Sequence, residues 1–225
     1  MGFYSEWLKS IDTQNESKYI SSFLSSTPQS LEPLLNGNID ELLCACKILI
    51  LTPIEKFIKK IDEDNYFFAE NIVQFSNFDH AISSVTNVLE IENRDLTFTE
   101  LGKLIMHSKL EGACKKYGEN HSKLAAEFSL VTLNKNKSYY VRLTPFGQFM
   151  NSLDKIEKIE IIKRMALRNC FVKELIFKAK KQVVLYSDLA MSVLSKSTMI
   201  RRKSNVKYLV SLILEDNEIL NNIVW

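Results

Sequence analysis

A short signature occurs twice in this chain, as Phe98-Thr99-Glu100-Leu101-Gly102-Lys103-Leu104-Ile105 and as Leu143-Thr144-Pro145-Phe146-Gly147-Gln148-Phe149-Met150. Each copy has an apolar residue, threonine, two variable residues, glycine, a polar residue and two apolar residues, and the threonines are 45 residues apart. Threonine is a good helix N-cap, proline is tolerated in the first turn, and glycine lets a helix approach a neighbour closely. The signature predicts a strand that runs directly into a helix, within a repeated unit of helices and a hairpin. The alternative is a chance similarity between two amphipathic helix starts.

The composition indicates a mainly helical globular protein. Of 225 residues, 46% are hydrophobic and 25% charged, and only 6 are glycine and 4 proline, which disfavours a sandwich or barrel. There is no apolar run of about 18 residues and no basic start followed by an apolar stretch, so we expect a cytoplasmic protein without a membrane span. The four cysteines form no CxxC pair and no zinc-type cluster with histidine. We therefore expect reduced, buried thiols, no metal and no cofactor.

Helical periodicity and turn residues divide the chain into four parts. These are an N-terminal helical region (1–51), a first and acidic winged-helix unit (52–98), a second winged-helix unit (99–153), and a connector helix with a third helix-turn-helix-like unit (154–225). In the first unit we expect helices over about 52–61, 66–75 and 77–89, followed by a short hairpin that leads into Phe98. The expected fold class is mainly α, with tandem winged helix-turn-helix units and small hairpin wings.

The second unit is the clearer one. We expect helices over about 99–107, 109–117 and 120–128, with a break at Gly118. Two β-favouring runs, 130–133 and 139–143, surround a polar turn and predict a hairpin. Lys135 and Lys137 lie at its tip, where a wing would meet a phosphate backbone, although lysine also serves simply to keep an exposed turn soluble.

The third unit follows a connector helix over about 154–167. We expect a further helix over 170–181, an extended segment at 183–186, and a helix that Ser187 caps. Ser197 or Thr198 is expected to cap a long helix that continues to about Leu214, and the tail from Ile219 to Trp225 is a candidate strand.

Charge is distributed unevenly along the chain. Residues 1–95 carry 7 basic and 15 acidic side chains, whereas residues 96–225 carry 22 basic and 12 acidic ones. Between positions 135 and 207 the counts are 17 basic and 5 acidic. Such a separation suggests a polyanionic partner, and the alternative is an ordinary solvated face or a contact with the acidic N-terminal region.

The start of the last long helix is the best candidate for contact with duplex DNA. In helix-turn-helix proteins the N-terminal part of the second helix enters the major groove, and arginine and asparagine can bind base edges in a bidentate manner. The expected DNA-binding residues of this helix and of the hairpin are Lys135, Lys137, Arg142, Lys196, Ser197, Thr198, Arg201, Arg202, Lys203, Asn205 and Lys207.

Two motifs, Leu143-Thr144-Pro145-Phe146-Gly147 and Ser195 to Val206, resemble tandem winged-helix DNA-recognition modules of prokaryotic restriction and defence proteins. As architecture the resemblance extends over about residues 50–214. It implies a recognition subunit or regulator that binds double-stranded DNA, with a nuclease or ATPase subunit as protein partner. The alternative is a winged-helix protein-interaction subunit, like the small subunits of bacterial SMC complexes.

We do not expect an enzyme. The chain has no P-loop and no GxGxxG, and no β-rich segment that would hold the acidic and lysine residues of a restriction-type nuclease. His80, His107 and His121 are isolated in the sequence, whereas metal-dependent hydrolysis needs carboxylates or histidines that converge on one ion.

Overall fold

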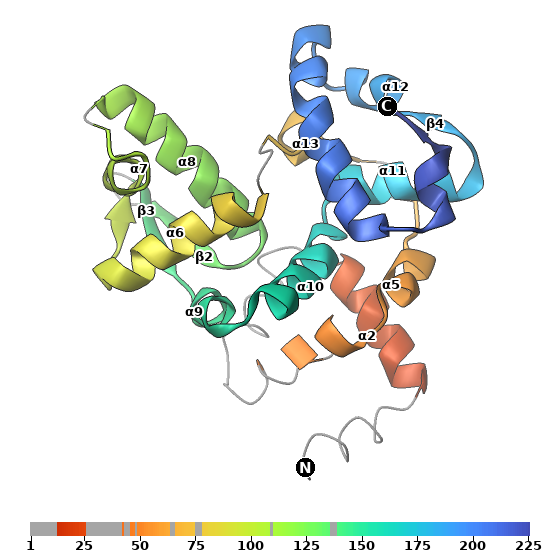
Figure 1. Cartoon of the computed structure of the whole chain (residues 1–225), viewed down its shortest axis with the longest axis horizontal. Coiled ribbons are helices and arrows are strands. Elements are labelled where there is room, and N and C mark those ends of the chain that lie inside the picture. Colours follow the sequence, from red (N-terminus) through yellow and green to blue (C-terminus); the bar gives the residue numbers. More distant parts are fainter. Residues whose placement is uncertain are drawn as a thin grey trace.

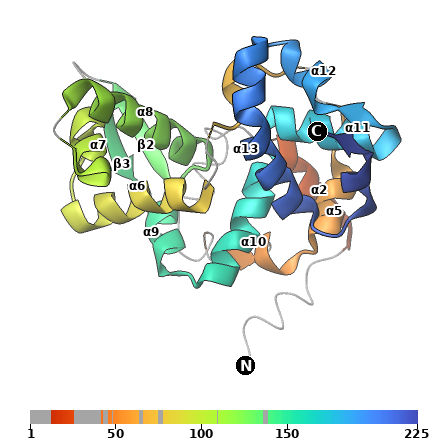
Figure 2. The same ribbon diagram turned by 45° about the horizontal axis from the view of Figure 1, so that its top comes forward.

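The computed structural model describes residues 13–25, 42, 46–47, 49–63, 66–74, 78–108, 110–135 and 139–225. Figure 1 shows two groups of elements, which remain separate in Figure 2. One group, residues 78–152, is called the hairpin lobe. The other, residues 155–225, is called the C-terminal lobe, and helices α2 (Thr13–Ser25) and α5 (Ile54–Lys60) lie against it. The structure is mainly helical with a small antiparallel sheet, as the composition predicts.

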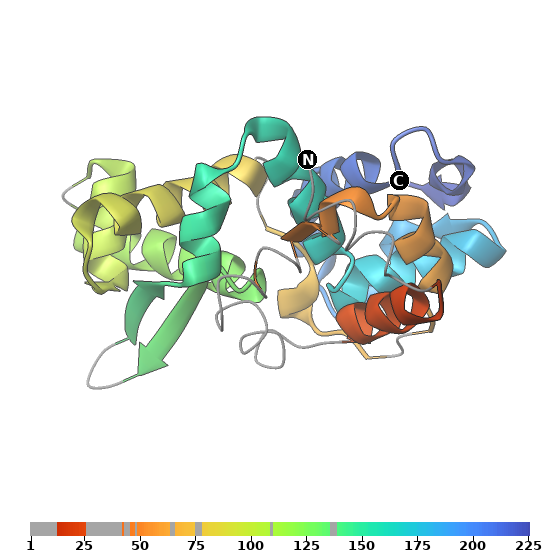
Figure 3. The same cartoon turned by 90° about the horizontal axis from the view of Figure 1, so that it is seen from below.

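The hairpin lobe begins with a helix and a two-residue strand. Its elements in chain order are α6 (Phe78–Glu92), β1 (Leu96–Thr97), α7 (Phe98–Met106), α8 (Glu111–Glu127), β2 (Val131–Lys135), β3 (Tyr139–Leu143) and α9 (Pro145–Ser152). The sheet order is β1-β3-β2, and both pairs are antiparallel. In Figure 3 the hairpin of β2 and β3 extends away from the helices of this lobe.

The pairing of β1 changes how the chain divides into units. Leu96 pairs with Val141 of β3, so the expected end of the first unit and the expected second unit share one sheet. Residues 90–98 form the end of α6, the strand β1 and the first residue of α7, where a short hairpin was expected. The region expected to be a helix over 66–75 contains, in its described part, only the short helix η1 (Ala69–Asn71). Residues on both sides of the boundary expected at position 98 therefore belong to one structural unit.

The two signatures are both strand-to-helix junctions, but their helix caps differ in register. Thr144 caps α9 as expected, because its Oγ1 accepts the amide of Gly147 at 2.9 Å and Pro145 occupies the first position. At the first copy the cap is Thr97, not Thr99. Its Oγ1 accepts the amide of Glu100 at 3.3 Å, and the Glu100 carboxylate accepts the Thr97 amide at 2.8 Å. This capping box starts α7 two residues earlier than the repeat predicts.

Helix α8 continues through Gly118, where the sequence suggests a break. A methyl group added at Gly118 would lie 2.0 Å from the carbonyl oxygen of Phe98, and one at Gly102 would lie 1.9 Å from that of Cys114. These two glycines therefore allow α7 and α8 to cross with their backbones nearly in contact. Glycine here serves helix packing, and the hydrogen bonds of α8 hold the helix together despite its low propensity.

The C-terminal lobe contains a helical core and a second small sheet. Its elements in chain order are α10 (Lys155–Ala166), α11 (Cys170–Lys181), β4 (Val184–Leu185), α12 (Tyr186–Met191), α13 (Lys196–Leu214), η2 (Glu218–Asn222) and β5 (Ile223–Val224). Strands β4 and β5 pair in parallel, Val184 with Ile223 and Leu185 with Val224. The extended segment is thereby confirmed, and the strand expected over Ile219 to Trp225 is limited to β5, because η2 occupies the start of that tail.

The C-terminal lobe repeats the order helix, strand, helix, helix of the hairpin lobe. The strand-to-helix junctions correspond, because Leu96-Thr97-Phe98-Thr99-Glu100-Leu101-Gly102 matches Val184-Leu185-Tyr186-Ser187-Asp188-Leu189-Ala190 in residue class at every position except Thr97 and Leu185. Both helices begin at the buried aromatic residue, so Leu185 and not Ser187 is the N-cap of α12.

Helices α8 and α13, each the second helix after the first strand of its lobe, also match at several buried positions. The buried pairs, each 85 residues apart, are Cys114 and Met199, His121 and Val206, Leu124 and Leu209, Ala125 and Val210, and Phe128 and Ile213. At these five positions the two helices face inward alike, whereas the buried Gly118 and Ser122 of α8 correspond to the half-buried Lys203 and the exposed Lys207 of α13. The exposed Lys115 and Lys116 of α8 can be compared directly with the exposed Ile200 and Arg201 of α13.

Candidate nucleic-acid interface

Helix α13 begins at Lys196, shortly after α12 ends at Met191, and it carries no acidic residue over its 19 positions. Its N-cap is Ser195, not Ser197 or Thr198, and the Ser195 hydroxyl lies within hydrogen-bonding distance of the Thr198 hydroxyl at 3.1 Å. Met199, Val206 and five further side chains face the core. The first half of α13 is thus anchored on one side and leaves its other side to solvent.

The outward side of this half is basic. Lys196, Ser197, Arg201 and Lys207 are exposed, and Thr198 and Lys203 are half-buried. In the part of the chain that the structure describes, Lys196, Arg201 and Lys203 form no ion pair. Lys207 lies over the Trp225 ring, 6.0 Å from its centroid. These six predicted residues share one end of α13, and we call Lys196, Ser197, Ile200, Arg201, Lys203, Ser204 and Lys207 the α13 face.

Two predicted contact residues do not belong to this face. The Arg202 guanidinium donates to the carbonyl oxygens of Ala69 and Ile72, the latter at 2.9 Å, and burial lowers its pKa. Asn205 is only 7% exposed. Residues three or four positions apart share a side of a helix. Arg202 lies three residues after the buried Met199, and Asn205 lies four residues before the buried Leu209, so both side chains lie on the inner side of α13. Arg202 fixes the segment that leads into the hairpin lobe and is not available for base contact.

Three further basic residues of the C-terminal lobe donate to backbone carbonyls in the N-terminal part of the chain. Lys180 donates to the oxygens of Ile58 and Ile61 at 3.1 Å, at the end of α5, and Lys173 donates to that of Leu24 in the last turn of α2. Arg164 donates to the oxygen of Thr52 at 2.8 Å. Cations at helix C-termini satisfy unpaired carbonyls and interact favourably with the helix dipole. Part of the excess basic charge in residues 96–225 therefore binds backbone carbonyls within the protein itself.

The hairpin presents Lys135 at the described end of β2. Lys135 is exposed, and its Nζ lies 5.7 Å from the centre of the Tyr139 ring. That ring stacks on Phe98 at the start of α7, with centroids 5.4 Å apart. Lys137 lies outside the described residues. The hairpin thus brings one described, exposed lysine to the end of β2.

Arg142 lies at the base of the hairpin and is paired. Its Nε donates to Asp95 Oδ1 at 2.9 Å and its Nη2 to Asp95 Oδ2 at 2.8 Å. This bidentate pair lowers the pKa of the Asp95 carboxyl and raises that of Arg142. Since Asp95 precedes β1, the pair links β3 to the end of α6. The pair engages Nε and Nη2 of Arg142, whose side chain remains 62% exposed.

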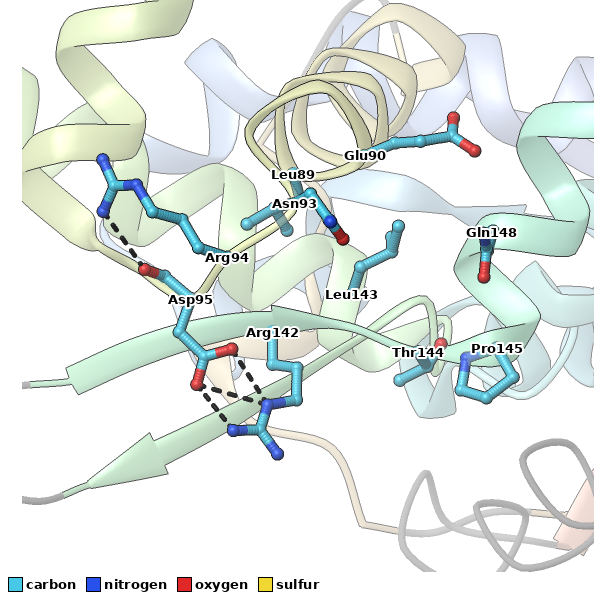
Figure 4. A pocket seen from close by; sticks show the side chains of 10 residues that line it. All are labelled: Leu89, Glu90, Asn93, Arg94, Asp95, Arg142, Leu143, Thr144, Pro145 and Gln148. Atoms are coloured by element: carbon cyan, nitrogen blue, oxygen red, sulfur yellow. Dashed lines mark hydrogen bonds and ion pairs between the residues drawn. The ribbon is translucent and has the colours of Figure 1, made fainter.

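A groove of about 440 Å³ adjoins this pair between α6, β3 and the start of α9. Figure 4 shows Arg94, Asp95 and Arg142 along one side and Glu90 and Gln148 on the other. Its charged residues have partners: Arg94 donates to Glu100 at 3.0 Å, and Asn151 donates to Glu90 at 2.8 Å. The groove therefore offers little net charge to a polyanion.

Helix α8 presents a face equivalent to that of α13 but with balanced charge. Lys115 and Lys116 stand at the positions of Ile200 and Arg201. Around them, Glu111 pairs with Lys103 at 2.8 Å and Glu119 pairs with Lys123 at 2.6 Å. The helix has three lysines and three glutamates, so it is neutral, whereas α13 has five basic and no acidic residues.

No catalytic arrangement stands out among the described residues. No group of three histidine, cysteine or carboxylate side chains that could hold a metal ion occurs within them. His121 is buried, and its Nδ1 lies 2.9 Å from the Tyr117 carbonyl oxygen. Cys46 and Cys114 are buried and Cys170 is half-buried, and burial raises the pKa of the Cys46 thiol to about 12. Within the described helices none is long and apolar enough to cross a membrane.

Sequence reasoning missed Ile200 and the correspondence between α8 and α13. The signal was present in the shared pattern of aromatic, hydroxyl, acidic residue and leucine at Phe98–Leu101 and Tyr186–Leu189. The Thr-x-x-Gly signature is more obvious, and it matches the start of α7 with the start of α9 instead of with the start of α12.

Comparisons with protein-family models, with curated proteins and with solved structures gave no match to this chain.

Proposed function

We propose that this chain is a non-catalytic double-stranded DNA-binding protein and that the α13 face is its main contact with DNA. The observation that carries the proposal is the charge of this face. Basic side chains without ion-pair partners in the described structure gather at the start of a helix that contains no acidic residue. Phosphate contacts of this kind supply most of the affinity of non-specific DNA binding.

The topology supports the same proposal. A helix, a short strand, two helices and a hairpin, with strand order β1-β3-β2, is the arrangement expected of a winged helix, and we propose that residues 78–143 form one. The C-terminal lobe then holds a related unit in which β5 replaces the hairpin. The finer role, a recognition subunit or regulator of a restriction or defence system with a nuclease or ATPase partner, rests on the resemblance of the two sequence motifs.

A second candidate is a protein-interaction subunit, and the outer side of the small sheet favours it. Val183, Leu185 and Val224 are exposed large apolar side chains, and Leu185 and Val224 lie side by side in the register of β4 and β5. Apolar side chains gathered at a surface are typical of docking sites for other proteins.

A salt series of duplex binding separates the two functions. For DNA binding we expect affinity, measured by fluorescence anisotropy, to fall steeply with salt, with a log–log slope of about −0.9 per neutralised phosphate. Absence of duplex affinity at low salt would remove the DNA function and leave the interaction role.

A further inference from the structure

An exposed isoleucine lies in the middle of the basic α13 face. The Ile200 side chain is 58% exposed, although isoleucine is among the residues most often buried in proteins. β-Branched side chains also lower helix propensity slightly, so Ile200 adds little to α13 itself. At the equivalent position α8 has Lys115, which shows that the architecture does not require an apolar residue there.

The neighbours of Ile200 define the chemistry around it. Lys196 and Ser197 precede it by one turn, Arg201 is adjacent, and Ser204 follows by one turn, all on the outward side of the helix. Hydrogen-bond donors therefore surround one branched apolar group. The major groove of DNA offers a matching surface, in which phosphate and base acceptors surround the 5-methyl group of thymine.

We propose that Ile200 contacts the 5-methyl group of a thymine in the major groove, so that α13 prefers thymine at one position of its site. This inference rests on the proposed function and adds a base-specific contact to it. Arg201 lies where it can reach a base or phosphate next to that thymine. The equivalent residues of α8, Lys115 and Lys116, have charge but no apolar group with which to read a methyl group.

Uracil provides the test, because it pairs as thymine does and lacks only the methyl group. A duplex is first selected from a random pool by the wild-type chain and then prepared with uracil in place of thymine. Loss of one buried methyl group is expected to weaken binding about fourfold. The I200A variant should bind the thymine duplex about as weakly as the uracil duplex and should no longer distinguish the two.

The K115A variant is the matched control, since it changes the equivalent outward position of α8. It should keep the wild-type ratio of thymine to uracil affinity. Equal binding of both duplexes by the wild type, or an unchanged ratio in I200A, would overturn the proposal while duplex binding itself stands. Absence of binding to any duplex by the wild type would instead remove the proposed function. Circular dichroism of I200A verifies that the helix content is unchanged.

Discussion

The hairpin lobe and the C-terminal lobe share the order helix, strand, helix and helix, yet they differ in how the two helices after the strand cross, α7 with α8 and α12 with α13. Gly102 and Gly118 let α7 and α8 meet backbone to backbone. In the C-terminal lobe Ala190 stands at the position of Gly102, so α12 has a side chain at this point of its crossing with α13. The lobes differ on the outside too, because α8 is neutral and α13 strongly basic. The comparison shows that one architecture can carry two surfaces with different uses.

The largest effect is expected from Gly102→Ala. The new methyl group would lie 1.9 Å from the Cys114 carbonyl oxygen, so the helices of the hairpin lobe must move apart. Overpacking of this kind costs about 3 kcal/mol or more in the free energy of unfolding. Ala190→Gly at the equivalent position should cost only about 1 kcal/mol, the propensity difference. Urea unfolding measures both, and similar losses would contradict the difference in helix crossing.

A smaller effect distinguishes the neighbours Arg202 and Arg201. Arg202→Ala removes the hydrogen bonds to the Ala69 and Ile72 carbonyls and is expected to lower the free energy of unfolding by about 2 kcal/mol. Arg201→Ala should leave stability within about 0.5 kcal/mol of the wild type, since its side chain is exposed. Thermal unfolding of the two variants checks this, and an equal loss in both would show that the assignment of inner and outer side is incorrect.

The smallest of the stability effects concerns the junction between the lobes. Asn169 donates to the carboxylate of Glu127 at 2.6 Å, and burial raises the pKa of this carboxyl. A carboxyl whose folded pKa is raised binds its proton more readily in the native state, so stability increases as pH falls through that pKa toward the lower pKa of the unfolded chain. Glu127→Gln should therefore remove part of the increase in the free energy of unfolding that this carboxyl gives the wild type as pH falls. Urea unfolding at several pH values tests this, and an unchanged pH dependence would contradict it.

Local patterns predicted much of the secondary structure. Capping and periodicity indicated α5, α10 and α11 close to their observed bounds, and alternation around a polar turn indicated β2 and β3. These signals succeed because neighbouring residues decide helix starts and hairpins. The pairing of β1 with β3 joins residues far apart in the chain, and two residues of strand leave no pattern to detect.

The candidate site was predicted only in part, for a related reason. Counting charges found the basic region but did not separate Arg201, which faces solvent, from Arg202, which holds backbone carbonyls. Lys180 likewise counts as a surface charge in the sequence and caps the end of α5 in the structure. Which cations have carbonyl partners depends on tertiary packing, so the α13 face became visible only with the fold.

The central claim, that the α13 face and not its counterpart on α8 binds duplex DNA, is tested most directly by two charge variants in one salt series. K196A/R201A/K203A removes three charges from the α13 face, and K115A/K116A removes two from the neutral helix. Anisotropy titrations should show that the first variant loses about 0.9 of log–log slope for each lost phosphate contact and most of its affinity at moderate salt. The second should bind nearly as the wild type does. Equal losses in the two variants, or unchanged binding by the first, would contradict the claim.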